Sequence, residues 1–262
     1  MHDVSMAHAD SGAARAVFAP ALASWVVIPA ILAIALLILN QVTDFDRTIT
    51  RFFYDAHLSA FPLRTNFWLD VVAHHWAKYA VVTLGCVVAA GLLLSFALPH
   101  LRPQRRLLLF VLLAVGLAPL SVTAGKAASA RHCPWNVEEF GGLVPYVKYF
   151  EPMAADVEPG HCFPAGHAST GFALMAFYFA AHAQRMRRAA AVALAIGIVA
   201  GLALGFGRVA QGAHFVSHVL WSGLLCWMVM VLLYRLLMRT RAEQGDRQLR
   251  AEPAPLPTMP RT

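Results

Sequence analysis

Three short stretches of this chain combine cations, histidines and glycines, and each has residue types that suit phosphate chemistry. They cover residues 126–135, 160–170 and 207–218. Arginine offers a planar fork of N–H donors that fits phosphate oxygens, whereas lysine supplies a point charge. The cations of these stretches are therefore predicted to converge on one polyanion; they are Lys126, Arg131 and Arg208.

The second stretch, Pro164-Ala165-Gly166-His167, comes directly before an expected helix. Backbone N–H groups at a helix start can face an anion, and the helix dipole favours negative charge there. Glycine lets the backbone approach such an anion closely. Ala165 and Gly166 are thus predicted to line a phosphate site.

His214 and His218 are four residues apart, so they share one face of the last expected helix. One imidazole can orient the other and leave it as a nucleophile or base. His214 is predicted to be the nucleophile and His218 its orienting group, while His167 protonates a leaving group. The same spacing also suits zinc. The alternative is therefore a metal-dependent hydrolase with four candidate ligands: His161, His167, His214 and His218.

The elements that must position these residues have the composition of membrane spans. Of the 262 residues, 59% are hydrophobic and 13% are charged, against roughly 45–50% and 25% in soluble domains. The apolar residues fall into runs long enough to cross a bilayer, which needs ~20 residues. The sequence predicts an all-α, six-span transmembrane helical bundle within residues 21–238. The runs cover residues 21–42, 79–98, 107–124, 167–183, 189–206 and 215–237.

The net charge of +7 is divided unevenly between the two sides of this predicted bundle. The side with both termini carries 13 of the 21 basic residues and five of the 14 acidic residues. The positive-inside rule then predicts cytoplasmic termini and motifs on the outer side. Because topology explains the basic excess, no nucleic-acid partner is expected. A non-enzymatic anion transporter is a second alternative, but it predicts polar residues in mid-span, which are almost absent.

The segments outside the spans are predicted to differ in structure. Residues 43–78 interleave charges with eight aromatic residues, which favours interfacial helices between the first two spans. Residues 1–20 are predicted to form a cytoplasmic tail. Residues 239–262 hold four prolines and are predicted to form a disordered cytoplasmic tail.

The order and spacing of the three stretches resemble the type 2 phosphatidic acid phosphatase superfamily. The family pattern is Lys-x6-Arg-Pro, then Pro-Ser-Gly-His, then Ser-Arg-x5-His-x3-Asp. Lys126 and Pro134 keep the spacing of the first motif, and Arg208 and His214 keep that of the third. The resemblance spans roughly residues 126–218, and six expected spans with outer motifs favour its membrane lipid phosphatase branch.

Four positions depart from the family pattern. Cys133 stands where the first motif has arginine, so Arg131 is predicted to replace it. Ala165 and Gly207 replace two serines. His218 replaces the aspartate that orients the nucleophile, and it offers no negative charge to stabilise an imidazolium. We expect slower turnover unless a carboxylate from elsewhere in the chain assists.

The resemblance implies a hydrolase that needs no metal or cofactor and that forms a phosphohistidine. His214 would attack phosphorus, and His167 would protonate the leaving lipid oxygen. The three cations and the Gly166 amide would stabilise the equatorial oxygens. The implied partner is a phosphorylated lipid at the periplasmic face of a bacterial inner membrane. Phosphatidylglycerol phosphate, undecaprenyl diphosphate and lipid A phosphate all fit, and the sequence ranks none of them.

Two of the four cysteines, Cys133 and Cys162, lie in one outer segment, each beside a motif. An oxidising periplasm permits a disulfide between them. The bond would pin the cation motif to the Pro-x-Gly-His turn, and loop closure would stabilise the fold by ~3–4 kcal/mol. Two unpaired thiols or a pair of zinc ligands are the alternatives. Cys86 and Cys226 lie inside expected spans and suit packing.

Overall fold

Long apolar helices dominate the computed structural model, which describes residues 24–238 apart from the side chains of residues 72–75. Both predicted tails, residues 1–20 and 239–262, lie outside the described residues. No strand longer than an isolated bridge is found in the described part, so the all-α prediction is confirmed. Five helical stretches are long and apolar enough to cross a membrane: Ser24–Val42, α3 (Ala77–Ala97), Pro99–Ala127 with η2 (Pro99–Gln104) and α4 (Arg105–Ala127), α7 (Arg187–Ala210) and α8 (Val216–Leu237).

The remaining predicted span, residues 167–183, consists of three consecutive helical pieces. They are α5 (Gly166–Phe172), the 3-10 turn η5 (Ala173–Met175) and α6 (Ala176–Ala183). Helix α5 packs closely against α7 at Gly171. A Cβ at this position would lie 2.5 Å from backbone atoms of Ala200 and Gly201 in α7, so only glycine fits. Five of the six predicted spans are therefore found as long apolar helices, and the stretch predicted as the remaining span is an interrupted helix.

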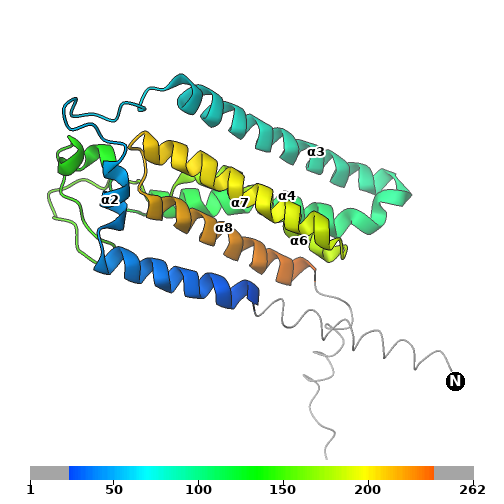
Figure 1. Ribbon diagram of the computed structural model, residues 1–262. Coiled ribbons are helices and arrows are strands. Elements are labelled where there is room, and N and C mark those ends of the chain that lie inside the picture. Colours follow the sequence, from blue (N-terminus) through cyan, green and yellow to red (C-terminus); the bar gives the residue numbers. More distant parts are fainter. Residues whose placement is uncertain (1–23, 239–262) are drawn as a thin grey trace, which may run out of the picture.

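The core of the bundle lies between α4, α5, α6, α7 and α8. Large apolar side chains fill it, among them Phe110, Phe172, Phe179 and Met230. Helix α3 runs along the outside of this group, and the helix Ser24–Val42 flanks it on the opposite side (Figure 1). Many large apolar side chains remain exposed on the outer surface, which suits a surface surrounded by lipid.

The short helices and long loops gather at one end of the bundle (Figure 1). They include α2 (Phe45–Arg51), the π-helix η1 (Trp68–Trp76), η3 (Pro134–Asn136) and η4 (Glu138–Phe140). Helix α2 and η1 lie between the first two spans, where the sequence predicted interfacial helices. The start of the helix Ser24–Val42 and the end of α8 lie at the opposite end of the bundle (Figure 1).

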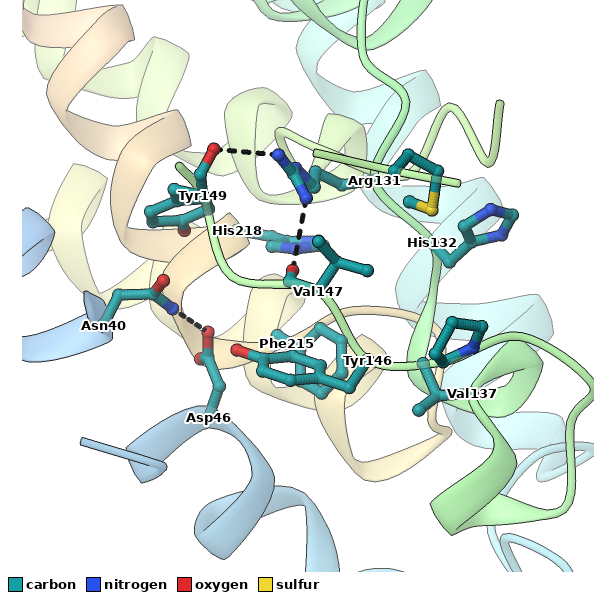
Figure 2. Close-up of a pocket in the computed structure, with 12 residues that line it drawn as sticks. Asn40, Asp46, Arg131, His132, Val137, Tyr146, Val147, Tyr149, Phe215 and His218 are labelled. Atoms are coloured by element: carbon teal, nitrogen blue, oxygen red, sulfur yellow. Dashed lines mark hydrogen bonds between the residues drawn. The ribbon is translucent and has the colours of Figure 1, made fainter. Parts of the chain in front are cut away.

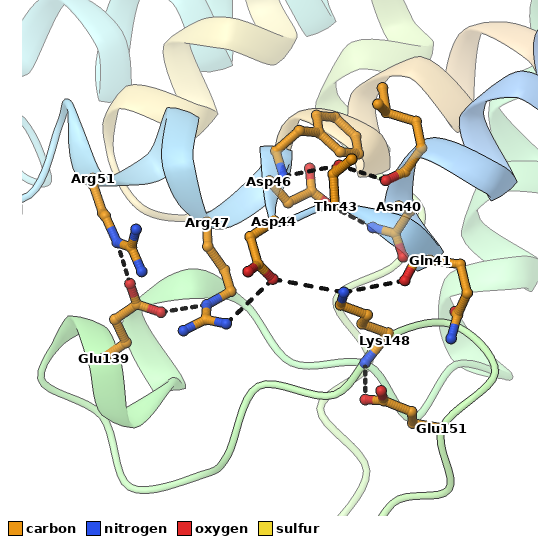
Figure 3. A network of polar contacts seen from close by, with 12 residues as sticks. Asn40, Gln41, Thr43, Asp44, Asp46, Arg47, Arg51, Glu139, Lys148 and Glu151 are labelled. Carbon is orange, nitrogen blue, oxygen red and sulfur yellow. Dashed lines mark hydrogen bonds and ion pairs between the residues drawn. The ribbon is translucent and has the colours of Figure 1, made fainter.

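Ion pairs fix α2 against the loop that follows η3 (Figure 3). Glu139 accepts from Arg47 at 2.6 Å and also from Arg51, so two arginines of one helix share one carboxylate. Lys148 lies 3.7 Å from Asp44. These contacts join the start of the second half of the chain to a helix near its beginning.

Candidate active site

All three motif stretches meet at the loop-rich end of the bundle, and covalent and backbone bonds hold them together. Cys133 and Cys162 form a disulfide with a Cα–Cα distance of 5.3 Å, so this prediction is confirmed. The Trp135 N–H donates to the Gly212 carbonyl at 3.0 Å and joins the first stretch to the third. The three stretches therefore form one unit although they lie far apart in the sequence.

The turn between α7 and α8 depends on a glycine. Gly212 has φ of +73°, in the left-handed region that L side chains rarely adopt. A Cβ on Gly212 would also lie 2.4 Å from the ring of Phe61. This turn carries His214 to its place between the two helices.

A cavity of about 320 Å³ opens between α3, α4, α5 and α7. It brings together four predicted site residues: Lys126, Gly166, His167 and Arg208. We call it the cationic cavity. Its other lining residues come from the same helices and from η1: Leu69, Ala77, Lys78, Pro119, Thr123, Ser169, Thr170, Leu204 and Gly207. The cavity thus joins the charged motif residues to an apolar wall between spans.

Arg208 is held firmly at the wall of the cationic cavity. Its Nη1 donates to Gln211 Oε1 at 2.7 Å and to Asp70 Oδ1 at 3.4 Å. Its Nε is buried and has no protein partner. Lys126, on the facing helix, forms no ion pair within the described part of the chain. The site therefore keeps donors and positive charge available for an anion.

The imidazole of His214 is buried, with an exposed fraction of 3%. Burial lowers its pKa well below the ordinary value, and the nearby His218, Lys126, His167 and Arg208 lower it further. Its Nδ1 lies 3.5 Å from Cys162 Sγ, which carries no proton because it belongs to the disulfide. His214 is therefore neutral at physiological pH, and Nε2 is the ring nitrogen left for a substrate.

His218 lies beside His214 but does not hydrogen-bond to it. The ring centroids are 5.8 Å apart and the rings are inclined by 64°. His218 does not line the cationic cavity; it lines a second, smaller cavity (Figure 2). Its role as orienting group stays a prediction, since the two rings are close without a direct bond.

Two predicted phosphate ligands are engaged elsewhere. The Arg131 guanidinium donates to the backbone carbonyls of Tyr149 at 2.8 Å and Val147 at 3.4 Å (Figure 2). It also donates to the Glu151 carbonyl at 2.9 Å. Burial lowers the pKa of Arg131, although it remains a strong base. The Ala165 N–H donates to the His218 carbonyl at 3.1 Å. Neither residue lines the cationic cavity, so the structure does not bring them to the other predicted ligands.

The four-histidine metal set of the alternative is not brought together. His161 is exposed, and His167 lines the cationic cavity while His218 does not. The one compact group of His, Cys, Asp or Glu donors found among the described residues is Cys162, His214 and His218. Its sulfur lies in the disulfide and is no thiolate, so the donor set is a poor match to zinc.

Sequence reasoning missed three polar residues that support the site. Gln211 and Asp70 hold Arg208, and Asp46 accepts hydrogen bonds at the start of α8. Gln211 lies inside the third stretch, so its position was a usable signal. Asp46 and Asp70 reach the site from the segment between the first two spans, and their spacing gives no indication of it.

Comparisons with known proteins agree with this geometry. Residues 107–242 match the PAP2 superfamily. The lipid A 4'-phosphatase of Francisella tularensis subsp. novicida (strain U112) is 30% identical over 172 residues, which is 62% of this chain and 74% of that protein. No solved structure matches the chain significantly. The family match covers about half of the chain and includes all three motif stretches. The long apolar helices are those expected of a multi-pass membrane protein. The chain belongs to the PAP2 superfamily and is one of its membrane lipid phosphatases.

Proposed function

We propose that this protein hydrolyses a phosphate ester of a membrane lipid at the periplasmic face, through a phosphohistidine at His214. The observation that carries the proposal is the cationic cavity, in which Lys126, His167 and Arg208 lie together. These three groups also act on the buried His214 electrostatically, which indicates that all four share one site.

In the first step, Nε2 of neutral His214 attacks phosphorus. The N–P bond forms as the bond from phosphorus to the lipid oxygen breaks, and His167 gives that oxygen a proton. Lys126 and Arg208 stabilise the charge on the equatorial oxygens. Gly166 has no atom within 4 Å of where a Cβ would stand, so the backbone there can approach the phosphate.

In the second step, water attacks the phosphohistidine. His167 takes the proton from this water, the N–P bond breaks, and inorganic phosphate leaves with His214 neutral again. Every group in this scheme is a side chain or amide of the chain. The proposal therefore includes independence from metal ions and cofactors.

A periplasmic site and cytoplasmic ends are supported by two observations. The start of the helix Ser24–Val42 and the end of α8 lie at the end of the bundle opposite the loops that carry the motifs (Figure 1). The segments predicted on the side of the termini are rich in arginine, including Arg102, Arg105 and Arg187. The disulfide lies at the motif end, as expected for an oxidising compartment.

A phosphate monoester of lipid A is the first substrate to test, because a lipid A 4'-phosphatase is among the relatives. The apolar part of the cavity lining, which includes Leu204 and Pro119, suits the acyl part of such a lipid. Phosphatidylglycerol phosphate and undecaprenyl diphosphate are the comparison substrates.

The test is phosphate release by the purified protein in detergent, with each of the three lipids and with or without EDTA. We expect release from at least one lipid, with the same rate in EDTA. Loss of release in EDTA, restored by zinc, would favour the metal-dependent alternative. No release from any of the three lipids would contradict the proposed function.

A further inference from the structure

A second cavity lies beside His218 and shares no lining residue with the cationic cavity (Figure 2). We call it the His218 chamber. Its volume is about 20 Å³, which is room for one water molecule. Its polar lining comes from the first helix, α2, the loop after Ala130 and α8: Asn40, Asp46, Arg131, His132, Tyr146, Tyr149 and His218.

Asp46 brings a buried carboxylate to this chamber. Its exposed fraction is 2%, and no other Asp or Glu in the described part of the chain is buried. It accepts hydrogen bonds from the Ser217 N–H at 2.9 Å, from the Ser217 hydroxyl and from Asn40 Nδ2 at 2.9 Å. Three donors and no acceptor surround it, which is the environment of an ionised carboxylate.

These bonds also place Asp46 at the N-terminus of α8. The Ser217 N–H belongs to the first turn of that helix, where backbone donors lack partners within the helix. A carboxylate there satisfies one of them and interacts favourably with the helix dipole. His214 precedes the helix by two residues and His218 is its third residue.

His218 faces the chamber with an unused polar atom. Its Nδ1 is buried and has no protein partner, and such atoms in proteins are usually paired with ordered water. A water in the chamber can bridge this nitrogen to Asp46. The carboxylate would then act on His214 through His218. The ring centroids of these two histidines are 5.8 Å apart.

We propose that Asp46 is a positioning residue that supplies, from α2, the negative charge that position 218 lacks. It holds the start of α8 and shares the chamber with His218, one water and Arg131, whose guanidinium donates to loop carbonyls. When His214 bonds to phosphorus its ring becomes positively charged, and the carboxylate stabilises that state. No bond forms to Asp46 and no proton needs to move to it. This inference rests on the proposed function.

The titration of Asp46 gives the proposal a pH signature. Burial raises the pKa of Asp46 to about 6, although bonds from Ser217 and Asn40 oppose the rise. Above this value the carboxylate is charged, and below it the charge is lost, so activity should fall as the pH drops through 6. The other titratable or charged groups that face Asp46 or neighbour it on α2 are Arg131, His132, Tyr146, Tyr149, His218, Asp44 and Arg47.

The test compares Asp46→Asn with Glu139→Gln in the full-length protein in detergent. Both variants turn a carboxylate that contacts α2 or α8 into an amide, but Glu139 does not line the chamber. We expect Asp46→Asn to lower kcat by about 10- to 100-fold with little change in KM, and to remove the acidic fall near pH 6. Glu139→Gln should lower the melting temperature without changing kcat or the pH profile.

Rescue separates charge from folding. A carboxylate placed beside His214 by His218→Asp should restore the Asp46→Asn variant to within about threefold of wild type. The same His218→Asp change alone should move the acidic fall below pH 6, a readout that needs no Asp46 variant to fold. The inference is overturned if Asp46→Asn matches Glu139→Gln in kcat and pH profile, or if His218→Asp neither rescues nor moves the profile. Wild-type activity that is lost in His214→Ala would uphold the proposed function in either case.

Discussion

The cationic cavity and the His218 chamber differ in size and in the charged groups that line them. The cationic cavity is about 320 Å³ and presents Lys126 and Arg208, whereas the His218 chamber is about 20 Å³ and contains the carboxylate of Asp46. The first can admit a lipid phosphate and the second only a water. Burial keeps His214 neutral before attack, and the nearby cations add to this effect. In the proposed scheme the carboxylate of Asp46 favours the charged ring afterwards, and Arg131, which lines the same chamber, is bound by loop carbonyls. Asp46 would then take the place of the aspartate that position 218 lacks.

The largest expected effect comes from removing the proposed nucleophile, His214. His214→Ala should lower kcat for lipid phosphate release by ~10⁴-fold or more, because no other nucleophile is in place. His161→Ala, which changes an exposed ring in the neighbouring loop, is the matched control and should keep wild-type activity. Similar losses in both variants would instead favour a histidine metal site.

Substitution of Arg208 tests whether the cationic cavity binds the phosphate. Arg208→Ala should lower kcat/KM by ~10²- to 10³-fold and weaken inhibition by inorganic phosphate, since it removes an oriented cation from the cavity. Arg208→Lys should recover only part, because the planar fork is lost. Arg64→Ala is the control: this arginine stacks on Trp135, 4.8 Å from the ring centroid, and does not line the cavity. Unchanged phosphate inhibition in Arg208→Ala would show that the anion binds elsewhere.

Removing the disulfide tests whether the first and second motif stretches must be held together. Cys133→Ser with Cys162→Ser should lower the free energy of unfolding by ~3–4 kcal/mol and kcat by about tenfold, because His214 Nδ1 loses the sulfur beside it. Cys86→Ser, at an exposed position in α3, is the control for thiol loss. Thermal melting and turnover of the two proteins give the comparison. A double variant as stable and as active as Cys86→Ser would remove the disulfide from the account.

Arg131 should give the smallest effect on chemistry. Its guanidinium is occupied by three carbonyls of the loop 147–151, so Arg131→Ala should lower the melting temperature and kcat by less than tenfold. Inhibition by inorganic phosphate should stay as in wild type. Weakening of that inhibition to the level of Arg208→Ala would restore the sequence-based role of Arg131 as a phosphate ligand.

The sequence predicted the all-helical fold and the disulfide, and it singled out Lys126, His167 and Arg208, which line one cavity, because each follows from local patterns. Apolar runs have the length of a bilayer, and motif residues lie at the ends of those runs, so they must share a side. The break at η5 was not predicted, since residues 167–183 hold no proline and no Asp, Glu, Lys or Arg that would mark it, and the close contact of Gly171 with α7 is a tertiary effect.

The roles of Arg131 and Asp46 show what local patterns leave open. Arg131 lies two residues from the position of the family arginine, and only the folded loop reveals that carbonyls surround its guanidinium. Asp46 lies 171 residues before its partner Ser217, in a segment with several other acidic residues. No spacing rule connects them, because the contact depends on how α2 crosses the end of the bundle.

The central claim, phosphoryl transfer to His214, is tested most directly by trapping the intermediate. The protein is mixed with a lipid carrying a ³²P-labelled phosphate, quenched with alkali within the first turnover and separated on a denaturing gel. We predict label on the protein that survives alkali and is lost in acid, as a phosphohistidine should be. The label should be absent from His214→Ala and present in His161→Ala. Turnover without any labelled protein, or equal label in His214→Ala, would contradict the account.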